Sequence, residues 1–284
     1  MPRNLNLPDG YLVDLPPVQE MDCLRTAERI TIDGRLDEPA WARAPWSEPF
    51  VKMDTGAPVS LDTRMALLWD DENLYAAFRL EDRDIWGSHT EHHDHVYHRD
   101  SDAEIFIEGD GVYYELGVNP INTIYQVLWT WLDPVVARQD AATLTRLLSN
   151  ERFLHFLPRR DERLGRIGET DWQLPGLRHA VHVDGTLNCP SVEDRGWTVE
   201  FALPWAGLAR LGHAHTPPRP GDVWRIGASR CQHFRTGEPS GPRKTGDWPT
   251  PESQFVDWSW NRHGYINMHI PERWSKVRFV DDSC

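Results

Sequence analysis

Hydrophobic and polar residues alternate along the chain in short runs, which is the pattern of β-strands buried on one face. Residues 30–34 form such a run and end in the turn-forming pair Asp33-Gly34. Glycine, proline and aspartate separate the runs, so the pattern predicts an all-β, antiparallel two-sheet β-sandwich rather than alternating strands and helices. The other runs cover residues 64–69, 74–80, 103–108, 112–119, 123–131, 180–183, 197–203, 223–230 and 276–280.

Local signals refine this pattern at three places. The acidic residues 70–73 separate two of the runs and predict a hairpin turn. Asp37 is expected to cap a single helical turn in which Pro39 takes its favoured first position. Around residues 138–170 the leucines fall at helical spacing behind Asp140, an expected N-cap, so a partly helical insertion is predicted there.

The domain organisation follows from the same pattern. Residues 1–27 are rich in proline and acidic residues and are expected to form a lead-in on the surface. Residues 28–284 are expected to form one β-sandwich, with the helical segment as an insertion and not a second domain. No internal repeat of fixed period is visible.

Charge and composition limit the partners that this chain can have. The 44 acidic and 30 basic residues give a formal charge of −14, which repels phosphate backbones and anionic lipids, so neither a nucleic-acid nor a membrane partner is expected. No window of eighteen residues is continuously apolar, and the amino terminus lacks a run of signal-peptide length. As written the chain is expected to be cytoplasmic, with a secreted context left open. The four cysteines form no Cys-x-x-Cys pair and are interpreted as free thiols.

Several stretches together resemble the family 9 carbohydrate-binding modules. They occur in the family's order, and the resemblance covers about residues 28–280. It implies a DOMON-type β-sandwich of two packed sheets, which binds a carbohydrate or related polyol in a groove on the concave sheet without catalysis. The matching stretches are residues 32–41, 68–75, 100–107, 113–119, 196–205 and 267–274.

The resemblance also implies contact residues. Glu104 matches a glutamate that takes a sugar hydroxyl, whereas the arginine of those modules is Gly117 here. Their two clamping tryptophans align near Tyr97 or His98 and near Met268. Arg230 is added because a guanidinium can form paired hydrogen bonds to neighbouring hydroxyls. The full set expected to contact the ligand is Glu104, Asn119, Arg230, Trp258, Trp260, Trp129 and His98.

The fourteen tryptophans divide into two groups. Trp129 with Trp131, and Trp258 with Trp260, alternate so that each pair puts both indoles on one face of a strand. Each pair is either a flat aromatic platform for the ligand or packing beneath the insertion. Five others are expected in the core because they lie in or beside apolar strands: Trp41, Trp69, Trp197, Trp205 and Trp224.

Two kinds of metal site are conceivable from the residue types. The resemblance implies a structural calcium ion, for which Asp100, Asp102 and the turn at Asp70 offer oxygen ligands. Five histidines within residues 89–98 could bind a transition metal instead, with His92 and His95 among the ligands. Their spacing matches no defined zinc motif, so a solvated polar loop is the favoured interpretation.

Other functions stay open beside sugar binding. A metal-assisted hydrolase or lyase could use the same groove, with the histidine-rich loop as its metal or acid–base centre. A scaffold that binds a protein partner through surface tryptophans is a third alternative. Haem, which related DOMON-type sandwiches hold, is not expected, because Met268 and His269 would point to opposite faces of a strand.

Overall fold

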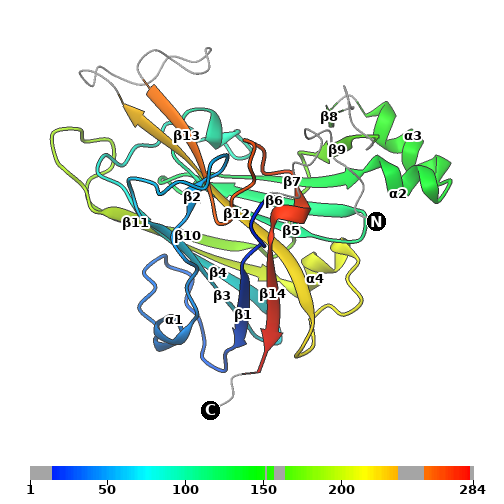
Figure 1. The fold of residues 1–284 in the computed structure, drawn as a ribbon, viewed down its shortest axis with the longest axis horizontal. Helices are drawn as coiled ribbons and strands as arrows, with labels where there is room; N and C mark the ends of the chain where they lie inside the picture. The colour runs from blue at the N-terminus through cyan, green and yellow to red at the C-terminus, as the bar shows by residue number, and fades with distance from the viewer. Residues whose placement is uncertain (1–14, 151, 157–163, 236–252, 282–284) are drawn as a thin grey trace.

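The computed structural model describes residues 15–150, 152–156, 164–235 and 253–281. Its strands follow one hydrogen-bonded path that folds into two packed layers, an all-β sandwich with few short helices (Figure 1). The first layer contains β10 (Arg178–Asp184), β11 (Gly196–Pro204), β4 (Asn73–Glu81), β3 (Thr63–Trp69) and β1 (Glu20–Arg25). The second contains β12 (Val223–Arg235), β5 (Ala103–Glu108), β6 (Val112–Val118), β7 (Ile124–Trp131), β9 (Arg166–Glu169) and β8 (Leu154–Phe156).

Three further strands complete the sheet. β14 (Ser275–Val280) joins the two layers, because it pairs with β1 on one side and β12 on the other. β13 (Ser253–Ser259) pairs with β12 and with the short β2 (Val51–Lys52). The helical elements are α1 (Pro39–Arg43), α2 (Leu132–Ala137), α3 (Ala141–Ser149), α4 (Trp205–Leu208), η1 (Val96–His98), η2 (Ala209–Leu211) and η3 (Pro271–Arg273).

The predicted strands are confirmed with one exception. Residues 30–34 form no strand, because the backbone N–H groups of Asp33 and Gly34 donate to the Glu200 carboxylate at 3.0 and 2.7 Å. The Trp41 indole donates to the same carboxylate at 2.8 Å. Glu200 is fully buried and anchors this segment to β11, so it is a structural residue and not an outward-facing one.

The lead-in expected over residues 1–27 contains a strand. β1 pairs in parallel with both β3 and β14, so the sandwich is not purely antiparallel. The composition hides this strand, because only Met21 and Cys23 bury fully apolar side chains. The helical turn at α1 is confirmed with Pro39 in first position, but its N-cap is Glu38 and not Asp37.

The predicted insertion follows β7 and adds two strands to the edge of the sheet beside it. α2 begins at Leu132, before the expected start, and α3 begins after Asp140, whose side chain accepts the Thr143 N–H at 3.0 Å. The chain then returns as β8 and β9, and β9 pairs with β7. The insertion therefore lies at the end of the second layer (Figure 1) and adds strands to its edge.

Alternation along the strands separates two faces of the second layer. Ile105, Leu116 and Ile226 belong to the main core between the layers. Four of the five tryptophans expected in the core lie there too, and the fifth, Trp41, packs in a second cluster around α1. Phe106, Tyr113 and their neighbours form a separate cluster on the outer face. That outer face carries the site described below.

The described surface bears on three expectations. Cys23, Cys189 and Cys231 are free thiols, as expected. None of the tryptophans in the described ranges is exposed, so the surface indoles expected of a protein-binding scaffold are not found there. No helix in those ranges is long and apolar enough to cross a membrane.

Candidate functional site

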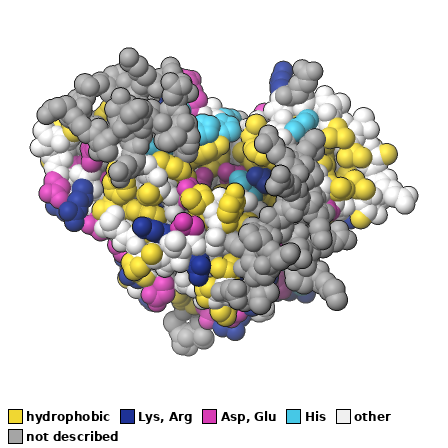
Figure 2. Space-filling view, turned by 45° about the horizontal axis from the view of Figure 1, so that its top comes forward, with side chains coloured by type: hydrophobic (Ala, Val, Ile, Leu, Met, Phe, Trp, Pro, Cys, Tyr) yellow, Lys and Arg dark blue, Asp and Glu magenta, His cyan; other side chains and the backbone are white. Residues whose placement is uncertain are grey.

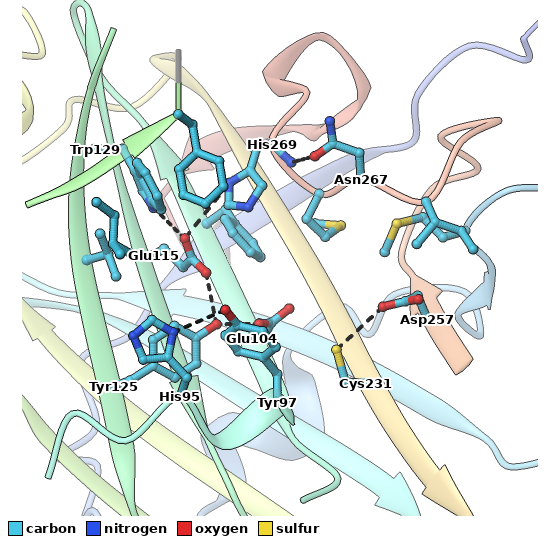
Figure 3. Close-up of a pocket in the computed structure, with 17 residues that line it drawn as sticks. His95, Tyr97, Glu104, Glu115, Tyr125, Trp129, Cys231, Asp257, Asn267 and His269 are labelled. Carbon is cyan, nitrogen blue, oxygen red and sulfur yellow. Dashed lines mark hydrogen bonds and ion pairs between the residues drawn. The ribbon is translucent and has the colours of Figure 1, made fainter. Parts of the chain in front are cut away.

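A pocket of about 230 Å³ opens on the outer face of the second layer. Its floor comes from β5, β6, β7 and β12, one wall from the histidine-rich segment, and the other walls from β8 and residues 266–269. Figure 2 shows histidine and acidic side chains among hydrophobic ones on this face, and Figure 3 shows the lining residues. No lysine or arginine is among the described residues that line the pocket.

Strand pairing puts the floor residues in rows across the sheet. Ser229, Glu104, Gly117 and Tyr125 are successive partners on β12, β5, β6 and β7. Because side chains alternate, the residue two positions along each strand lies on the same face. Glu115 of β6 therefore faces the pocket one row further on.

Gly117 determines how the Tyr125 ring lies. A Cβ atom at position 117 would be 2.1 Å from Cε1 of Tyr125, so the ring lies directly over the glycine backbone. In this position the Tyr125 hydroxyl reaches two carboxylates, Glu104 and, at 2.9 Å, Glu115. Tyr125 thus occupies the space above Gly117 of β6 and lies between the two carboxylates.

Glu104 and Glu115 share this single hydroxyl proton, which can be donated to only one of them at a time. Ser229 donates to Glu104, and the Trp129 indole donates to Glu115. Burial raises the pKa of Glu104, and burial together with the nearby Glu104 raises the pKa of Glu115 to about 7. The pair therefore takes up protons far more readily than exposed carboxylates do.

His269 lies above Glu115 at the pocket wall. Its Nδ1 is 2.7 Å from the Tyr113 hydroxyl and 3.9 Å from the Glu115 carboxylate. Burial holds the pKa of His269 well below its usual value, so the ring is neutral at pH 7. Met268 also lines the pocket, because this segment is an irregular loop and not the strand in which the two side chains would point apart.

A third row contains two more acidic groups beside a thiol. Asp257 of β13 pairs with Cys231 of β12, and the Cys231 N–H donates to Asp102 at 2.8 Å. Burial raises the pKa of Asp257 to about 7 and that of the Cys231 thiol well above its usual value. This face of the sheet thus concentrates buried acids without a basic partner among the lining residues.

Comparison with known proteins agrees with the sequence resemblance. Residues 32–116 match the carbohydrate family 9 binding domain-like family. Over this segment the chain is similar to the family 9 carbohydrate-binding modules. No curated protein matches the sequence significantly.

Three solved structures are similar to this chain over most of its length, and the first of them shows the same fold. A candidate carbohydrate-binding protein from Bacteroides uniformis has a TM-score of 0.56 at 12% identity, over 92% of this chain and 99% of that one. A family 9 module from Caldicellulosiruptor kristjanssonii, solved with cellotriose, has a TM-score of 0.48 at 11% identity, over 93% of this chain and 95% of that one. The same module solved with glucose has a TM-score of 0.48 at 12% identity, over 92% and 97% of the two chains.

Two of the residues expected to contact ligand lie in the pocket. Glu104 is on the floor, and Trp129 is on the wall, where its ring is parallel within 16° to that of Tyr113. Three other residues expected to contact the ligand do not reach this pocket. Arg230, Trp258 and Trp260 are 0, 2 and 1% exposed and belong to the interior of the sandwich.

Arg230 shows why that placement fails. It has the same parity along β12 as Ile226 and Ala228, both in the main core, so it points between the layers. There it donates to Thr63 at 2.8 Å and Asp82 at 3.3 Å, and its guanidinium lies 5.1 Å from the Trp258 ring centroid.

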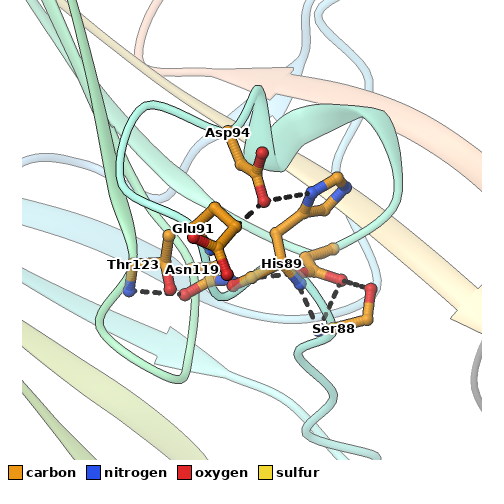
Figure 4. Close-up of polar contacts among 7 residues, drawn as sticks. Ser88, His89, Glu91, Asp94, Asn119 and Thr123 are labelled. Atoms are coloured by element: carbon orange, nitrogen blue, oxygen red, sulfur yellow. Dashed lines mark hydrogen bonds and ion pairs between the residues drawn. The ribbon is translucent and has the colours of Figure 1, made fainter.

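Asn119 and Asp100 hold the histidine-rich segment in place and are not among the pocket-lining residues; Figure 4 shows Asn119 with the neighbouring Ser88 and His89. The Asp100 carboxylate accepts from the backbone of Ser88 and His89, each at 2.9 Å, and from the Asn119 amide at 2.8 Å. The Asn119 carbonyl accepts the Thr123 N–H at 2.8 Å. A carboxylate this fully occupied by donors fixes a loop, so Asn119, expected to contact the ligand, and Asp100, expected to bind a metal, are both engaged in holding this segment.

The histidine-rich segment packs as stacked rings. His95 lies on the Tyr125 ring at 5.9 Å and on the His98 ring at 5.6 Å, nearly parallel to both. Burial lowers the pKa of His95 and lowers that of His98 to about 4. His95 lines the pocket, whereas His98 is not among its lining residues, and His92 packs against His93 with ring centroids 4.1 Å apart.

The expected metal ligands do not gather into one site. Asp70 accepts from Glu72, Asn73 and Tyr75 within its own hairpin turn. Within the described ranges, three metal-ligating side chains come close enough to share an ion in one place: Asp102, Glu104 and Cys231. Asp102 alone of the expected ligands belongs to that group.

Sequence reasoning missed several pocket residues. Cys231 and Asp257 come from strands whose partners are far away in sequence, and no local motif marks them. Phe156, about half exposed at 49%, lines the pocket from β8, inside the insertion that was expected only to decorate the sheet. For Tyr125 the signal was Gly117, a glycine in mid-strand, which indicates close approach of another group.

Proposed function

We propose that this protein binds a carbohydrate or related polyol non-covalently in the outer-face pocket, the groove that the sequence resemblance implies. The observation that supports this most directly is the position of Glu104 and Glu115 beside Tyr125 and Trp129 in one pocket. Carboxylates accept hydrogen bonds from paired hydroxyls, and aromatic faces pack on the apolar face of a sugar ring. The family match covers both carboxylates.

The size of the pocket limits the ligand to a small ring or the end of a chain. Its volume of about 230 Å³ is below the roughly 300–1,000 Å³ of sites for drug-sized ligands. Phe156 and Ile266 are exposed at the rim, where they could pack on a second unit. We therefore expect recognition of one terminal unit rather than of the middle of a polymer.

Tryptophan fluorescence tests this proposal, because Trp129 lies on the pocket wall. Neutral mono- and oligosaccharides are titrated into the protein, and each sugar is then recovered and checked by mass spectrometry. We expect a saturable fluorescence change with at least one sugar, which is recovered intact. A saturable change followed by recovery of a cleaved or dehydrated product would contradict the non-catalytic role.

A second candidate is the enzyme, a hydrolase or lyase. It is favoured by the pKa of Glu115, because a general acid works best with a pKa near the working pH. Against a glycosidase, both carboxylates accept from the same tyrosine hydroxyl on one pocket floor, whereas the two carboxylates of a glycosidase act from the two sides of the scissile bond. The sugar-recovery measurement separates the two candidates.

A further inference from the structure

We propose that Asp102, Glu104 and Cys231 form a binding site for a divalent metal ion of the zinc type at the pocket floor, with Asp257 as a fourth ligand. The site is built by three neighbouring strands. Cys231 on β12 lies between Asp257 on β13 and the start of β5, where Asp102 and Glu104 are two positions apart and share a face. All four side chains therefore converge on one region of the outer face, and Figure 3 shows three of them: Glu104, Cys231 and Asp257.

The ligand atoms lie close to the spacing that a shared metal ion requires. Ligand atoms of Asp102, Glu104 and Cys231 all lie within 4.8 Å of one another, and the Cys231 sulfur is 3.6 Å from Asp257 Oδ1. Two ligands bound to one zinc ion at about 2.0–2.3 Å can be at most about 4.6 Å apart. The 4.8 Å limit is slightly above this value, so an ion bound here would draw the side chains together.

Asp102 supplies an independent sign that something binds here. The residue is fully buried, and its Oδ2 has no hydrogen-bond partner among the described residues. Burying a carboxylate oxygen without a partner is costly, and Glu104 and Asp257 add further negative charge nearby. Arg230 does not satisfy this oxygen, because it points to the opposite face of β12 and pairs with Asp82.

The donor set determines the class of metal. A thiolate with carboxylates suits zinc or cobalt, whereas calcium takes oxygen ligands only. Binding would release the Cys231 proton, and any proton held by the carboxyl groups, to solvent. Glu104, Cys231 and Asp257 all line the pocket, so the ion would lie at the pocket floor beside the incoming ligand.

Cobalt(II) provides the test, because a thiolate ligand gives it a near-ultraviolet charge-transfer band. The chelator-treated full chain is titrated with cobalt, then with zinc as a competitor and calcium as a comparison. We expect stoichiometric cobalt binding with this band, displacement by zinc and no displacement by calcium. Sugar is absent from the experiment, so its result is independent of the proposed sugar binding.

Two variants and one control locate the ion. Cys231→Ser should abolish the charge-transfer band, and Asp102→Asn should lower cobalt affinity by about tenfold or more. Cys189→Ser, at a half-exposed cysteine outside the cluster, should bind as wild type does. Circular dichroism of each metal-free variant confirms that it is folded. Binding without the band, an unchanged band in Cys231→Ser, or no stoichiometric binding by the wild type would each overturn the proposal.

Discussion

Gly117 and Tyr125 set the shape of the pocket floor. The glycine leaves room for the tyrosine ring over β6, and the ring brings its hydroxyl between Glu104 and Glu115. The group between the two carboxylates is a neutral phenol, and no lysine or arginine is among the described residues that line the pocket. The floor is therefore acidic, and its charge depends on pH.

Gly117→Ala tests this contact. The added methyl group would lie 2.1 Å from the Tyr125 ring and should force it aside, at a cost of about 1–3 kcal/mol in unfolding free energy. In a Tyr125→Ala background the methyl group meets no ring, so the same substitution should cost much less. Denaturant unfolding of the four proteins measures the coupling between the two sites. An equal loss in both backgrounds would show that the ring is not what Gly117 accommodates.

The pKa change of Glu115 should make the free energy of unfolding depend on pH. Its pKa rises from 4.5 in the unfolded chain to about 7 in the fold, because it is buried and lies near Glu104. The folded state therefore binds the proton more tightly, so the stability from this group is complete below about pH 4.5 and is lost as pH rises through 7. A pKa change of this size corresponds to about 3 kcal/mol at most.

Glu115→Gln keeps the shape and cannot titrate. Denaturant unfolding from pH 4.5 to 8 should show a shallower loss of stability in this variant than in the wild type, both chelator-treated. Arg166 and His269 also face Glu115, and both are present in the variant and in the wild type, so the difference between the two curves reports Glu115. Glu91→Gln, an exposed control, should follow the wild type. Parallel curves for Glu115→Gln and the wild type would contradict the account.

At the scale of elements, the sequence predicted those helices and strands that a few neighbouring residues determine. The hairpin of β3 and β4 and the start of α3 each depend on a few neighbouring residues, and both were predicted correctly. Arg230 was misplaced although its parity with Ile226 already assigned it to the core face, because its chemistry was weighed above its position. β1 was missed because two buried apolar residues, Met21 and Cys23, are too few to indicate a strand from the sequence.

α3 supports a pocket wall through the insertion. Leu147 of α3 packs with Ile167 of β9, and β9 pairs with β8, which carries Phe156. Asp140→Ala removes the side chain that caps α3 and should lower stability by about 0.5–2 kcal/mol. Asp140→Asn keeps a capping oxygen and should lose less. Thermal unfolding of the two variants measures the difference, and equal losses would mean that the cap bond does not hold the helix.

At the scale of the whole molecule, the site depends on contacts that no local pattern contains. Cys231 is 129 residues from Asp102 and 26 residues from Asp257, yet the three lie side by side once the strands pair. The fold could therefore be predicted from the order of its family signatures. The pocket's acidic floor could not, because it follows from strand register across β13, β12 and β5.

Glu104 has two proposed roles, because it lines the sugar pocket and also belongs to the proposed metal site. Replacing it should affect both kinds of binding, whereas Cys231→Ser should affect the metal first. Glu104→Gln keeps the side-chain shape and removes a charged acceptor, which is worth about 1–3 kcal/mol of binding free energy.

Titration calorimetry of the wild type, Glu104→Gln and the exposed control Glu91→Gln against neutral mono- and oligosaccharides tests the central claim most directly. The account predicts saturable binding of at least one sugar by the wild type, equal binding by Glu91→Gln, and affinity about tenfold or more weaker in Glu104→Gln. Binding that is unchanged in a folded Glu104→Gln variant, or a wild type that binds no sugar in the panel, would contradict it.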